Sequence, residues 1–442
     1  MGGGGVTARP ALAVPRVVVH LGDCLEVMRA LPDNSLEAVV CDPPYGLSRE
    51  PDIAEVLRHW LAGDDYEHGG SGFMGREWDS FVPGPAYWSE ALRVVKPGGH
   101  LIAFAGQRTL DLMGIALRMG GWQVRDLLGW TYFSGFPKSL DVSKALDREA
   151  GAEREPDIYT GPNGKNAVYG SNMGGGVTLA RGTPSTPAAI RWQGFGTAIK
   201  PAIEPAILCR KPITEGSIAR NVLRWGTGAL NIDGCRFAHG DPAWAGPQEE
   251  PDTARTPSVV GDTPAGMGRG LAMGGRGHSD GRFPANLYAC PKASRSERER
   301  GCDGLPATRS HDVTGRDEGS AGARHARSGM TRAGEIRNVH PTVKPVRLLR
   351  WLCRLVTPPG GTVLDPFAGS GSCGVAAALE GLGYVGAEVE PDYHRIAEAR
   401  IAHALRWPSS WGDTAPGGEG KVDDDAERAA AAGQVGLFGA AK

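Results

Sequence analysis

The sequence predicts an α/β protein whose parallel sheet is built from both ends of the chain. Residues 15–150 and 338–404 alternate short apolar runs with amphipathic helical patterns, which is typical of parallel strands joined by crossover helices. Between them, residues 160–188 and 239–282 are rich in Gly and Pro and lack either periodicity, so both are expected to be long loops. A compact domain rarely contains two such loops. We therefore interpret the two ends as one α/β domain interrupted by an inserted middle.

The expected elements follow one another as an α/β fold requires. Residues 36–41 (LEAVVC) form an apolar run that leads directly into Asp42-Pro43-Pro44-Tyr45, so a strand is expected to end there. Lys96-Pro97-Gly98-Gly99 is expected to stop a helix before the next strand begins. The other expected strands are 16–21, 100–105, 127–133, 202–208, 362–365 and 384–388, and the expected helices are 24–30, 86–95, 346–356, 373–380 and 390–403.

Length and composition exclude several classes of protein. A chain of 442 residues can bury a full core without disulfide or metal staples. No run approaches the roughly 18 consecutive apolar residues of a membrane span, and the first ten residues, MGGGGVTARP, lack the basic and apolar segments of a secretory signal. We therefore expect a soluble protein of the cytoplasm, with no membrane partner.

The cysteines indicate reduced thiols. Eight Cys are scattered along the chain without a C-x-x-C pair, a pattern that fits neither a disulfide framework nor a zinc site. The alternative is that Cys290 and Cys302 share a metal, although their spacing matches zinc-ligand patterns poorly. We expect no metal.

The middle of the chain is its basic part. Lys and Arg outnumber Asp and Glu between residues 151 and 340, and the reverse holds for the rest. Such an excess can bind the phosphates of DNA, or it can belong to a solvated loop region. In the run from 292 to 300, three arginines lie close enough to line one helix as DNA contacts, and the interleaved Glu297 and Glu299 also permit a self-paired solvent-facing surface; these arginines are Arg295, Arg298 and Arg300.

The first chemical motif is Asp365-Pro-Phe-Ala-Gly-Ser-Gly371, followed by Glu388 at the end of the next expected strand. A strand, a Gly turn, a helix and an acidic residue at the next strand tip form a cradle for a nucleoside cofactor, because the glycines let the backbone approach the ligand and the carboxylate accepts from ribose hydroxyls. Residues 369–374 also match G-x-G-x-x-G, which keeps an NAD-dependent dehydrogenase as an alternative. A turn without a ligand is the other alternative, and a P-loop is excluded because no Lys-Ser or Lys-Thr follows the glycines.

The second motif is Asp42-Pro43-Pro44-Tyr45-Gly46 at the mouth of a strand. Two consecutive prolines fix φ and remove two N–H donors, so the local carbonyls are held as outward-facing acceptors. Together with the Asp42 carboxylate they form an acceptor-only pocket suited to an NH2 group, and Tyr45 offers an aromatic face to a planar ring. A simple proline turn with a packed tyrosine is the alternative.

Together these motifs resemble those of the S-adenosylmethionine-dependent DNA amino-methyltransferases, in the permuted (beta-group) order in which the target-amino motif precedes the cofactor motif. The resemblance covers residues 18–138 and 338–402, and it includes Gly22-Asp23-Cys24 and His340-Pro-Thr-Val-Lys-Pro345 besides the two motifs above. The middle looks like the variable region of methyltransferases carried by phages and prophages. The resemblance implies a Rossmann-like methyltransferase sheet with a large, loop-rich, inserted target-recognition region.

The resemblance also implies roles for individual residues. The methionine part of S-adenosylmethionine would lie on the 365–371 turn, including Asp365, Phe367, Gly369 and Gly371. Glu388 would hold the ribose, Asp23 with the adjacent Cys24 the adenine edge, and His340, Thr342 and Lys344 would close over the methionine end. Asp42 and the Pro43 carbonyl, beside Pro44, would accept from the exocyclic amine of a flipped base stacked on Tyr45, since that amine is inaccessible inside a duplex.

The resemblance predicts a site-specific enzyme acting on double-stranded DNA, with adenine N6 preferred over cytosine N4 because of Asp at the first motif position. RNA or protein amine methylation, a dehydrogenase and a DNA-binding protein with an inactive methyltransferase fold are the alternatives. Nothing in the sequence marks a nuclease partner or an oligomeric state, including a homodimer. The expected divisions are a flexible N-terminus (1–15), the catalytic half (16–150), the target-recognition region with a late catalytic strand near 202–210 (151–337), the cofactor half (338–405) and a flexible tail (406–442).

Overall fold

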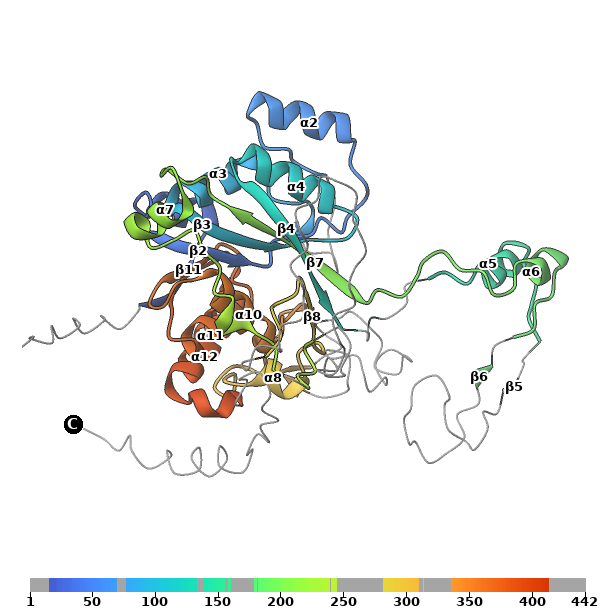
Figure 1. Ribbon diagram of the computed structural model, residues 1–442. Helices are drawn as coiled ribbons and strands as arrows, with labels where there is room; N and C mark the ends of the chain where they lie inside the picture. The colour runs from blue at the N-terminus through green and yellow to red at the C-terminus, as the bar shows by residue number, and fades with distance from the viewer. Residues whose placement is uncertain are drawn as a thin grey trace, which may run out of the picture. The chain divides into compact units, whose positions relative to one another are not determined.

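The computed structural model describes most of the two end segments and parts of the middle (Figure 1). The described residues are 16–69, 77–132, 135, 139–155, 158–159, 179–180, 182–238, 240–244, 281–309, 313 and 335–412. The expected N-terminal segment 1–15 and most of the two Gly- and Pro-rich stretches therefore lie outside the described residues, as does the tail beyond residue 412.

The chain divides into two compact units. The larger comprises Met1–Tyr132 and Ile203–Lys442, and the smaller comprises Phe133–Ala202. Both chain ends thus contribute to one unit, as the alternating pattern predicts. The expected boundary at residue 150 differs from this division, because the residues from 133 to 150 belong to the smaller unit and those from 203 onward to the larger.

The larger unit is organised around an eight-stranded sheet. Neighbouring strands are parallel except that β7 runs antiparallel to both of its neighbours, so the predicted α/β fold with a largely parallel sheet is confirmed. The first and last segments interleave, because β1 pairs with β12 and β2 pairs with β11. In sheet order the strands are β1 (Val17–Leu21), β12 (Gly383–Glu388), β11 (Thr362–Asp365), β2 (Leu36–Cys41), β3 (Val95–Phe104), β7 (Ile203–Arg210), β4 (Gln123–Thr131) and β8 (Leu287–Ala289).

Helices cover both faces of this sheet (Figure 1). The alternation of side chains along β2 shows how the two faces are buried, because Val40 belongs to the apolar cluster under α10, α11 and α12, whereas Val39 belongs to the cluster under α1, α3 and α4. The bounds of the larger unit's helices are α1 (Cys24–Arg29), α2 (Ile53–Ala62), α3 (Pro85–Val94), α4 (Leu110–Met119), α7 (Ile218–Trp225), α8 (Arg295–Glu299), α10 (Val346–Val356), α11 (Ser372–Leu379) and α12 (Pro391–Arg406).

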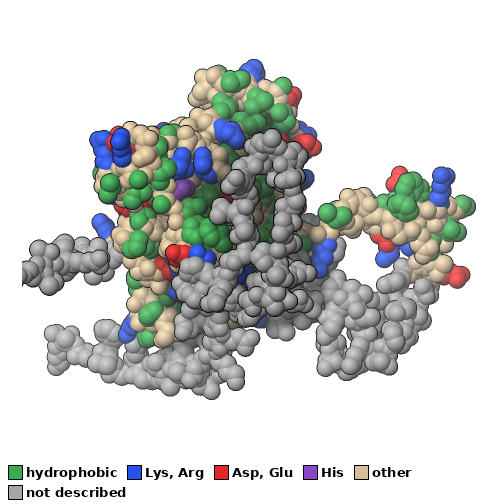
Figure 2. Space-filling model, in the orientation of Figure 1, with side chains coloured by type: hydrophobic (Ala, Val, Ile, Leu, Met, Phe, Trp, Pro, Cys, Tyr) green, Lys and Arg blue, Asp and Glu red, His purple; other side chains and the backbone are tan. Residues whose placement is uncertain are grey.

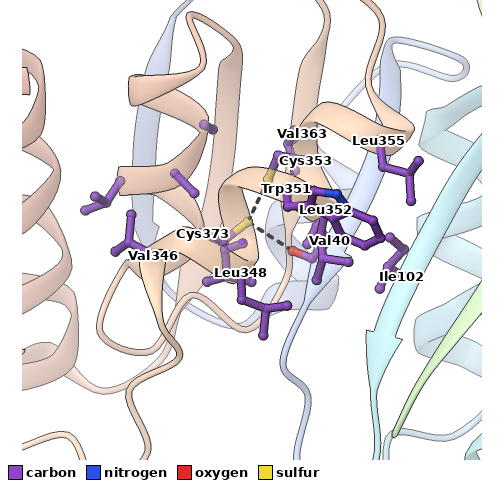
Figure 3. Close-up of a cluster of buried hydrophobic side chains, with 14 of the residues drawn as sticks. Val40, Ile102, Val346, Leu348, Trp351, Leu352, Cys353, Leu355, Val363 and Cys373 are labelled. Atoms are coloured by element: carbon purple, nitrogen blue, oxygen red, sulfur yellow. Dashed lines mark hydrogen bonds between the residues drawn. The ribbon is translucent and has the colours of Figure 1, made fainter. Parts of the chain in front are cut away.

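The core beneath the glycine turn is tightly packed (Figure 3). Cys373, in the first turn of α11, lies with its Sγ 3.9 Å from that of Cys353 on α10 and donates to the Val40 carbonyl of β2. These side chains are at most 4% exposed. Burying a side chain of Val or Leu size stabilises a fold by roughly 1.5–3 kcal/mol. Packing against α10 and β2 therefore holds the start of α11 firmly against the sheet.

The cysteines are all free and buried. Among the described residues, no group of three or more His, Cys, Asp or Glu is placed to hold a metal ion.

The expected strand start at residue 100 is wrong. Helix α3 ends at Val94, one residue before the predicted end, and β3 begins at once with Val95 and runs through Lys96-Pro97-Gly98-Gly99. The pairing of β2 with β3 shifts register between Leu36 and Ala38, so the strand accommodates the proline and glycines as an irregularity. The Pro97 carbonyl is satisfied from outside the sheet by Asn221 and Thr227.

The smaller unit is held by one buried carboxylate. Asp147 of α5 (Val142–Glu149) accepts from Arg154 Nε at 2.7 Å and from the hydroxyl of Thr186, which caps α6 (Pro187–Arg191). Short strands β5 (Ile158–Tyr159) and β6 (Leu179–Ala180) pair antiparallel within it. Its surface retains exposed apolar side chains, namely Leu140, Ile190, Trp192, Phe195 and Ile199.

The C-terminal region is ordered further than expected. Helix α12 continues to Arg406, and a 3-10 helix at Pro408–Trp411 follows, in which Trp411 is 5% exposed and donates to His403. The expected flexible tail from 406 is therefore wrong for residues 406–411. No helix in the described part of the chain has the length and apolar character that crossing a membrane requires.

Candidate active site

The predicted chemical residues gather at one edge of the sheet. Strands β1, β12, β11, β2 and β3 are parallel, so their carboxyl ends meet at this edge, and the antiparallel β7 begins there. The chain leaves β11 for α11 on one face and leaves β2 for helices on the other, which makes the β11–β2 junction a topological switch point. Open α/β sheets bind ligands outside the carboxyl ends of their strands at such a point.

The Asp42–Tyr45 segment is fixed by contacts from two neighbouring segments, one around Asp79 and the other between β3 and α4. Asp42 follows the last residue of β2. The Tyr45 backbone donates to Asp79 Oδ1 at 2.7 Å and accepts from the Thr109 hydroxyl at 2.6 Å. A Cβ at Gly106 would lie 3.2 Å from the Tyr45 Cβ, so the backbone after β3 passes close to the tyrosine. The prolines and these contacts together hold the segment rigidly.

The Asp42 side chain has polar partners on both carboxylate oxygens. The Tyr45 hydroxyl donates to Oδ1 at 2.8 Å, and Lys344 Nζ donates to Oδ2 at 2.6 Å. Lys344 also reaches the Tyr45 hydroxyl at 3.0 Å and Glu204 Oε2 at 3.2 Å, and Lys292 lies 3.3 Å from Glu204 Oε1. We call these five residues the Asp42 cluster.

This cluster corrects the predicted acceptor-only pocket, because an ammonium group is part of it. Lys344 comes from the segment before α10, 302 residues away from Asp42 in the sequence. Its side chain is only 7% exposed. The structure therefore places Lys344 against the target-amine motif, whereas the resemblance implied a contact with the methionine end of the cofactor.

The electrostatics of the cluster keep both Lys344 and Glu204 charged. Burial alone would lower the pKa of Lys344, but the charges of Asp42 and Glu204 outweigh it and raise that pKa above its ordinary value. Burial would likewise raise the pKa of Glu204, yet the ammonium groups of Lys344 and Lys292 hold it below its ordinary value. Burial raises the pKa of Tyr45 well above its usual range, so its hydroxyl stays protonated and can donate.

The glycine turn closes against the end of β12. Glu388 Oε2 accepts from the Gly369 backbone at 2.7 Å, and its Oε1 accepts from the Glu390 backbone at 2.9 Å. Gly369 has φ +53°, and a Cβ there would lie 2.7 Å from His340 Nε2. Gly371 has φ +71°, and its Cβ would meet the Ala397 Cα of α12 at 2.7 Å. Both positions therefore require glycine.

Two buried carboxyl groups flank this turn. Asp365 is 3% exposed and accepts from the Phe367 backbone and from the Tyr384 hydroxyl. Burial raises the pKa of Asp365 to about 7, with the negative charges of Asp42 and Glu388 adding to the shift. Burial also raises the pKa of Glu388, while its backbone donors partly oppose the shift. This edge of the sheet thus favours hydrogen-bond donors and positive charge.

The His340–Lys344 segment passes beside the glycine turn. His340 lies in ring contact with Trp78 and Tyr393, and its Nδ1 accepts from the Thr342 backbone. Burial, helped by the positive charge of Arg298, lowers the pKa of His340 to about 3, so the ring is neutral near pH 7. Thr342 is exposed.

The Gly22–Cys24 segment follows β1 beside Glu388. The Gly22 backbone donates to the Glu388 carbonyl at 2.9 Å, whereas the Asp23 carboxylate caps α1 by accepting from Leu25 and Glu26. Burial raises the pKa of Cys24 to about 12, so its thiol is protonated. The adenine-edge role of Asp23 stays a prediction.

The three predicted DNA-contact arginines do not form one free basic face. Arg298 is 7% exposed and donates to the His340 carbonyl, Arg295 donates to the Glu335 carbonyl, and the Arg300 guanidinium lies over Trp411. On the face of the molecule that Figure 2 shows, the Lys and Arg side chains of the described residues lie among hydrophobic and other side chains. The burial of Arg298 removes it from solvent, so it is not in a position to meet a phosphate.

Sequence reasoning missed Glu204, Glu297 and Arg400. Arg400 is fully buried and holds the glycine turn, donating to the Ser370 carbonyl at 2.6 Å and to the Ser372 hydroxyl at 2.9 Å. The Glu297 carboxylate accepts from the Val346 backbone at the start of α10. Glu204 gave a signal, because it is a charged residue at the start of an otherwise apolar strand; Arg400 resembles any arginine of an exposed helix.

A protein-family model matches a part of the chain that contributes to this edge of the sheet. Residues 273–399 match the family model N6_N4_Mtase, described as DNA methylase. The matched range includes α8, the His340–Lys344 segment, the glycine turn and Glu388, but not Asp42.

Among curated proteins, the chain is 49% identical over 67 residues to the methylase YubD of Escherichia coli (strain K12), a span that is 15% of this chain and 30% of YubD. It is 42% identical over 62 residues to the type II methyltransferase M2.DpnII of Streptococcus pneumoniae, which is 14% of this chain and 23% of that protein. The chain thus matches less than a third of the length of either relative. Among solved structures, the complex M1.HpyAVI-SAM covers 87% of this chain and 98% of its own, at 13% identity and a TM-score of 0.36.

Proposed function

We propose that this protein transfers a methyl group from S-adenosylmethionine to the exocyclic amine of a base flipped out of double-stranded DNA. The observation that carries the proposal is the convergence of Asp42 and the 365–371 turn at one edge of the sheet. The first supplies acceptors for an amine, and the second has the glycines and the terminal carboxylate that a nucleoside cofactor needs. The match of residues 273–399 to a DNA methylase family supports the same activity.

The chain's residues fit the cofactor by their chemistry. Each Glu388 oxygen accepts one backbone N–H, which leaves lone pairs for ribose hydroxyls. Helix α11 begins at Ser372, and the preceding Gly371 provides no side-chain cap, so the N–H groups of its first turn suit a carboxylate such as that of a methionine moiety. When bound, S-adenosylmethionine supplies an electrophilic methyl group on its sulfonium sulfur.

The target amine would be held by acceptors from the Asp42 segment. A carboxylate oxygen of Asp42 and the Pro43 carbonyl accept its two N–H groups, which turns the nitrogen lone pair toward the methyl donor. Tyr45 contributes an aromatic face for the flipped base, and base–aromatic stacking is worth about 1–3 kcal/mol. Because the segment is rigid, catalysis rests mainly on positioning. Asp42 need not be a strong base, since the nitrogen becomes acidic only as it is alkylated.

The finer assignment that we propose is adenine N6, in a permuted methyltransferase of the type carried by phages and prophages. The Asp at the first position of the Asp42–Tyr45 motif supports adenine, and cytosine N4 is the second candidate because the matched family model names both amines. The middle of the chain, residues 151–337 together with the rest of the smaller unit, would read the target sequence. Residues of the cofactor site would be Asp23, Cys24, His340, Thr342, Asp365, Phe367, Gly369, Gly371 and Glu388.

A methyl-transfer assay tests this proposal directly. The full chain is incubated with tritiated S-adenosylmethionine and with unmethylated DNA, RNA or protein in parallel, and the labelled DNA is digested to nucleosides. We expect label in DNA alone, in N6-methyladenine. Label in N4-methylcytosine would overturn the base assignment, and label in RNA or protein would overturn the substrate.

The variant that tests the role of Asp42 in the same assay is Asp42→Ala. We expect it to abolish transfer while S-adenosylmethionine affinity, measured by calorimetry, stays within a few fold of wild type, because Asp42 belongs to the amine motif and the cofactor residues follow β11 and β12. Turnover near the wild-type rate in this variant would exclude Asp42 as the amine acceptor.

A further inference from the structure

Lys344 is bonded to the carboxylate that the proposed function assigns to the substrate amine. An ammonium group has three N–H donors, and in Lys344 all three have partners: Asp42 Oδ2 at 2.6 Å, the Tyr45 hydroxyl at 3.0 Å and Glu204 Oε2 at 3.2 Å. The group also lies over the rings of Phe104, Tyr45 and Trp130 at 4.9–5.9 Å. The free protein therefore keeps a cation where the proposed reaction requires a neutral NH2.

Each oxygen of the Asp42 carboxylate already has a donor in this arrangement, and the donor to Oδ2 is a charged ammonium group. Its Oδ1 accepts from Tyr45 and its Oδ2 from Lys344. A neutral amine forms a weaker hydrogen bond to a carboxylate than an ammonium does, so the amine cannot displace Lys344 by competing for Oδ2 alone. The ammonium needs another carboxylate to move to, because a buried charge without a partner is strongly destabilising.

Glu204 is placed to be that partner. It lies at the start of β7, where pairing with Trp130 of β4 fixes its backbone. Its Oε2 already contacts Lys344 and its Oε1 contacts Lys292, so a short shift of one ammonium group suffices. The aromatic rings around Lys344 offer a cation favourable contacts along the way.

We propose that Lys344 closes the amine subsite in the free protein, and that Glu204 is the positioning residue that receives its ammonium group when the target base binds. This inference rests on the proposed function. It makes Asp42 accept from two donors in turn, first Lys344 and then the base, while the site's net charge stays constant. The titratable and charged groups that face Lys344 and Asp42 are Tyr45, Glu204, Lys292, His340 and Asp365, with Tyr132 beside Glu204.

The first test replaces the receiving carboxylate. In Glu204→Gln, Lys344 keeps Asp42 as its only carboxylate partner and blocks the amine more firmly. We expect kcat/KM on a duplex that carries the mapped target site to fall about 30-fold or more, with unchanged affinity for S-adenosylmethionine. The matched control is Glu90→Gln, which removes a carboxylate paired with Arg93 near the end of α3, where the chain enters β3 at the opposite edge of the sheet, and should retain wild-type kinetics.

The second test removes the cation. In Lys344→Met, the ammonium group that lies 2.6 Å from Asp42 Oδ2 is gone, so the substrate amine meets no charged competitor at that oxygen. With no ammonium to receive, Glu204 has no further task, and adding Glu204→Gln to Lys344→Met should cost little more. Such non-additivity is the signature of residues that act through one another.

The outcomes separate the two proposals. A wild-type protein that transfers no methyl group to DNA overturns the proposed function and this inference with it. An active wild type whose Glu204→Gln variant matches it overturns this inference alone. So does a Glu204→Gln loss that persists undiminished in the Lys344→Met background, since Glu204 would then act on the base directly. Thermal melting of each variant identifies a loss that comes from unfolding.

Discussion

At the scale of single residues, burial decides which groups at the sheet edge carry charge. Asp365 and Glu388 are both buried next to the glycine turn, and both have a raised pKa. Lys344 is equally buried, yet two carboxylates keep it charged. The edge therefore combines carboxyl groups that hold protons easily with one firmly charged ammonium group, which is bonded to Asp42.

The raised pKa of Asp365 predicts a pH-dependent stability. The folded protein holds the proton up to about pH 7, whereas the unfolded chain loses it above its ordinary value of 3.8. Between these values the free energy of unfolding should fall with rising pH, by up to about 4 kcal/mol for this group alone. Asp365→Asn should remove that decline, and denaturant unfolding at pH 5 and pH 8 measures it. The exposed Asp392→Asn is the control, and an unchanged decline in Asp365→Asn would contradict the assignment.

The glycine turn gives a second prediction at this scale. Gly369→Ala puts a Cβ 2.7 Å from His340 Nε2 at a positive φ, so the turn must shift. We expect the dissociation constant for S-adenosylmethionine to rise about tenfold or more, a loss of at least ~1.4 kcal/mol. Gly381→Ala has a comparable φ of +68° but no atom within 4 Å, and it controls for backbone strain. Equal calorimetric affinities in the two variants would show that the close approach does not matter.

At the scale of elements, the sequence predicted most of the sheet and failed at specific places. Strands such as 362–365 were predictable because an apolar run of strand length stood between breakers. The start of β3 was not, because Pro97 and Gly98 are tolerated there through partners, Asn221 and Lys211, that lie more than 100 residues away. Glu204 and Lys344 also come together across a long stretch of sequence. No local pattern encodes the place of β7 in the sheet, so their contact could not be predicted.

Helix α8 shows how a basic run can be structural. The sequence suggested that its arginines contact DNA, but each of its residues from 297 to 299 holds a different part of the site. Glu297 accepts from the start of α10, Arg298 donates to the His340 carbonyl, and Glu299 accepts from the Arg337 backbone. Because α8 follows β8 and Lys292, the same segment braces the glycine turn and contributes to the Asp42 cluster.

This bracing role predicts a difference between two neighbouring arginines. Arg298→Ala leaves the buried His340 carbonyl without its donor, so the free energy of unfolding should fall by about 1–3 kcal/mol. The affinity for S-adenosylmethionine should fall as well, because His340 borders Gly369. Arg295→Ala, on the same helix but bonded near the surface, should change stability by less than about 0.5 kcal/mol. Chemical denaturation and calorimetry on both variants check this, and equal effects would refute it.

At the scale of the whole molecule, the parallel sheet makes the order of the two motifs in the chain irrelevant to the site. Strand β2 brings Asp42 from the first segment, and β11 and β12 bring the glycine turn and Glu388 from the last. These strands are neighbours with carboxyl ends at one edge, so the amine motif and the cofactor motif meet although more than 300 residues separate them. A sheet whose strand ends meet at one edge also tolerates insertions in the loops at that edge, and such loops commonly carry the residues that recognise a ligand.

The smaller unit is such an insertion. Its removal tests whether it carries target recognition while the larger unit binds the cofactor. It connects the end of β4 to the start of β7, and these strands are antiparallel neighbours in which Thr131 pairs with Ile203. A hairpin turn of two to five residues can therefore replace residues 133–202 without moving the sheet. We expect the shortened protein to fold and to bind S-adenosylmethionine with wild-type affinity, because the cofactor residues belong to the larger unit. Site-specific methylation of DNA should be lost, as sequencing of methylated sites would record. Retained methylation at the same sites would place target recognition in residues 203–337 instead, and lost cofactor binding would show that the two units share the site.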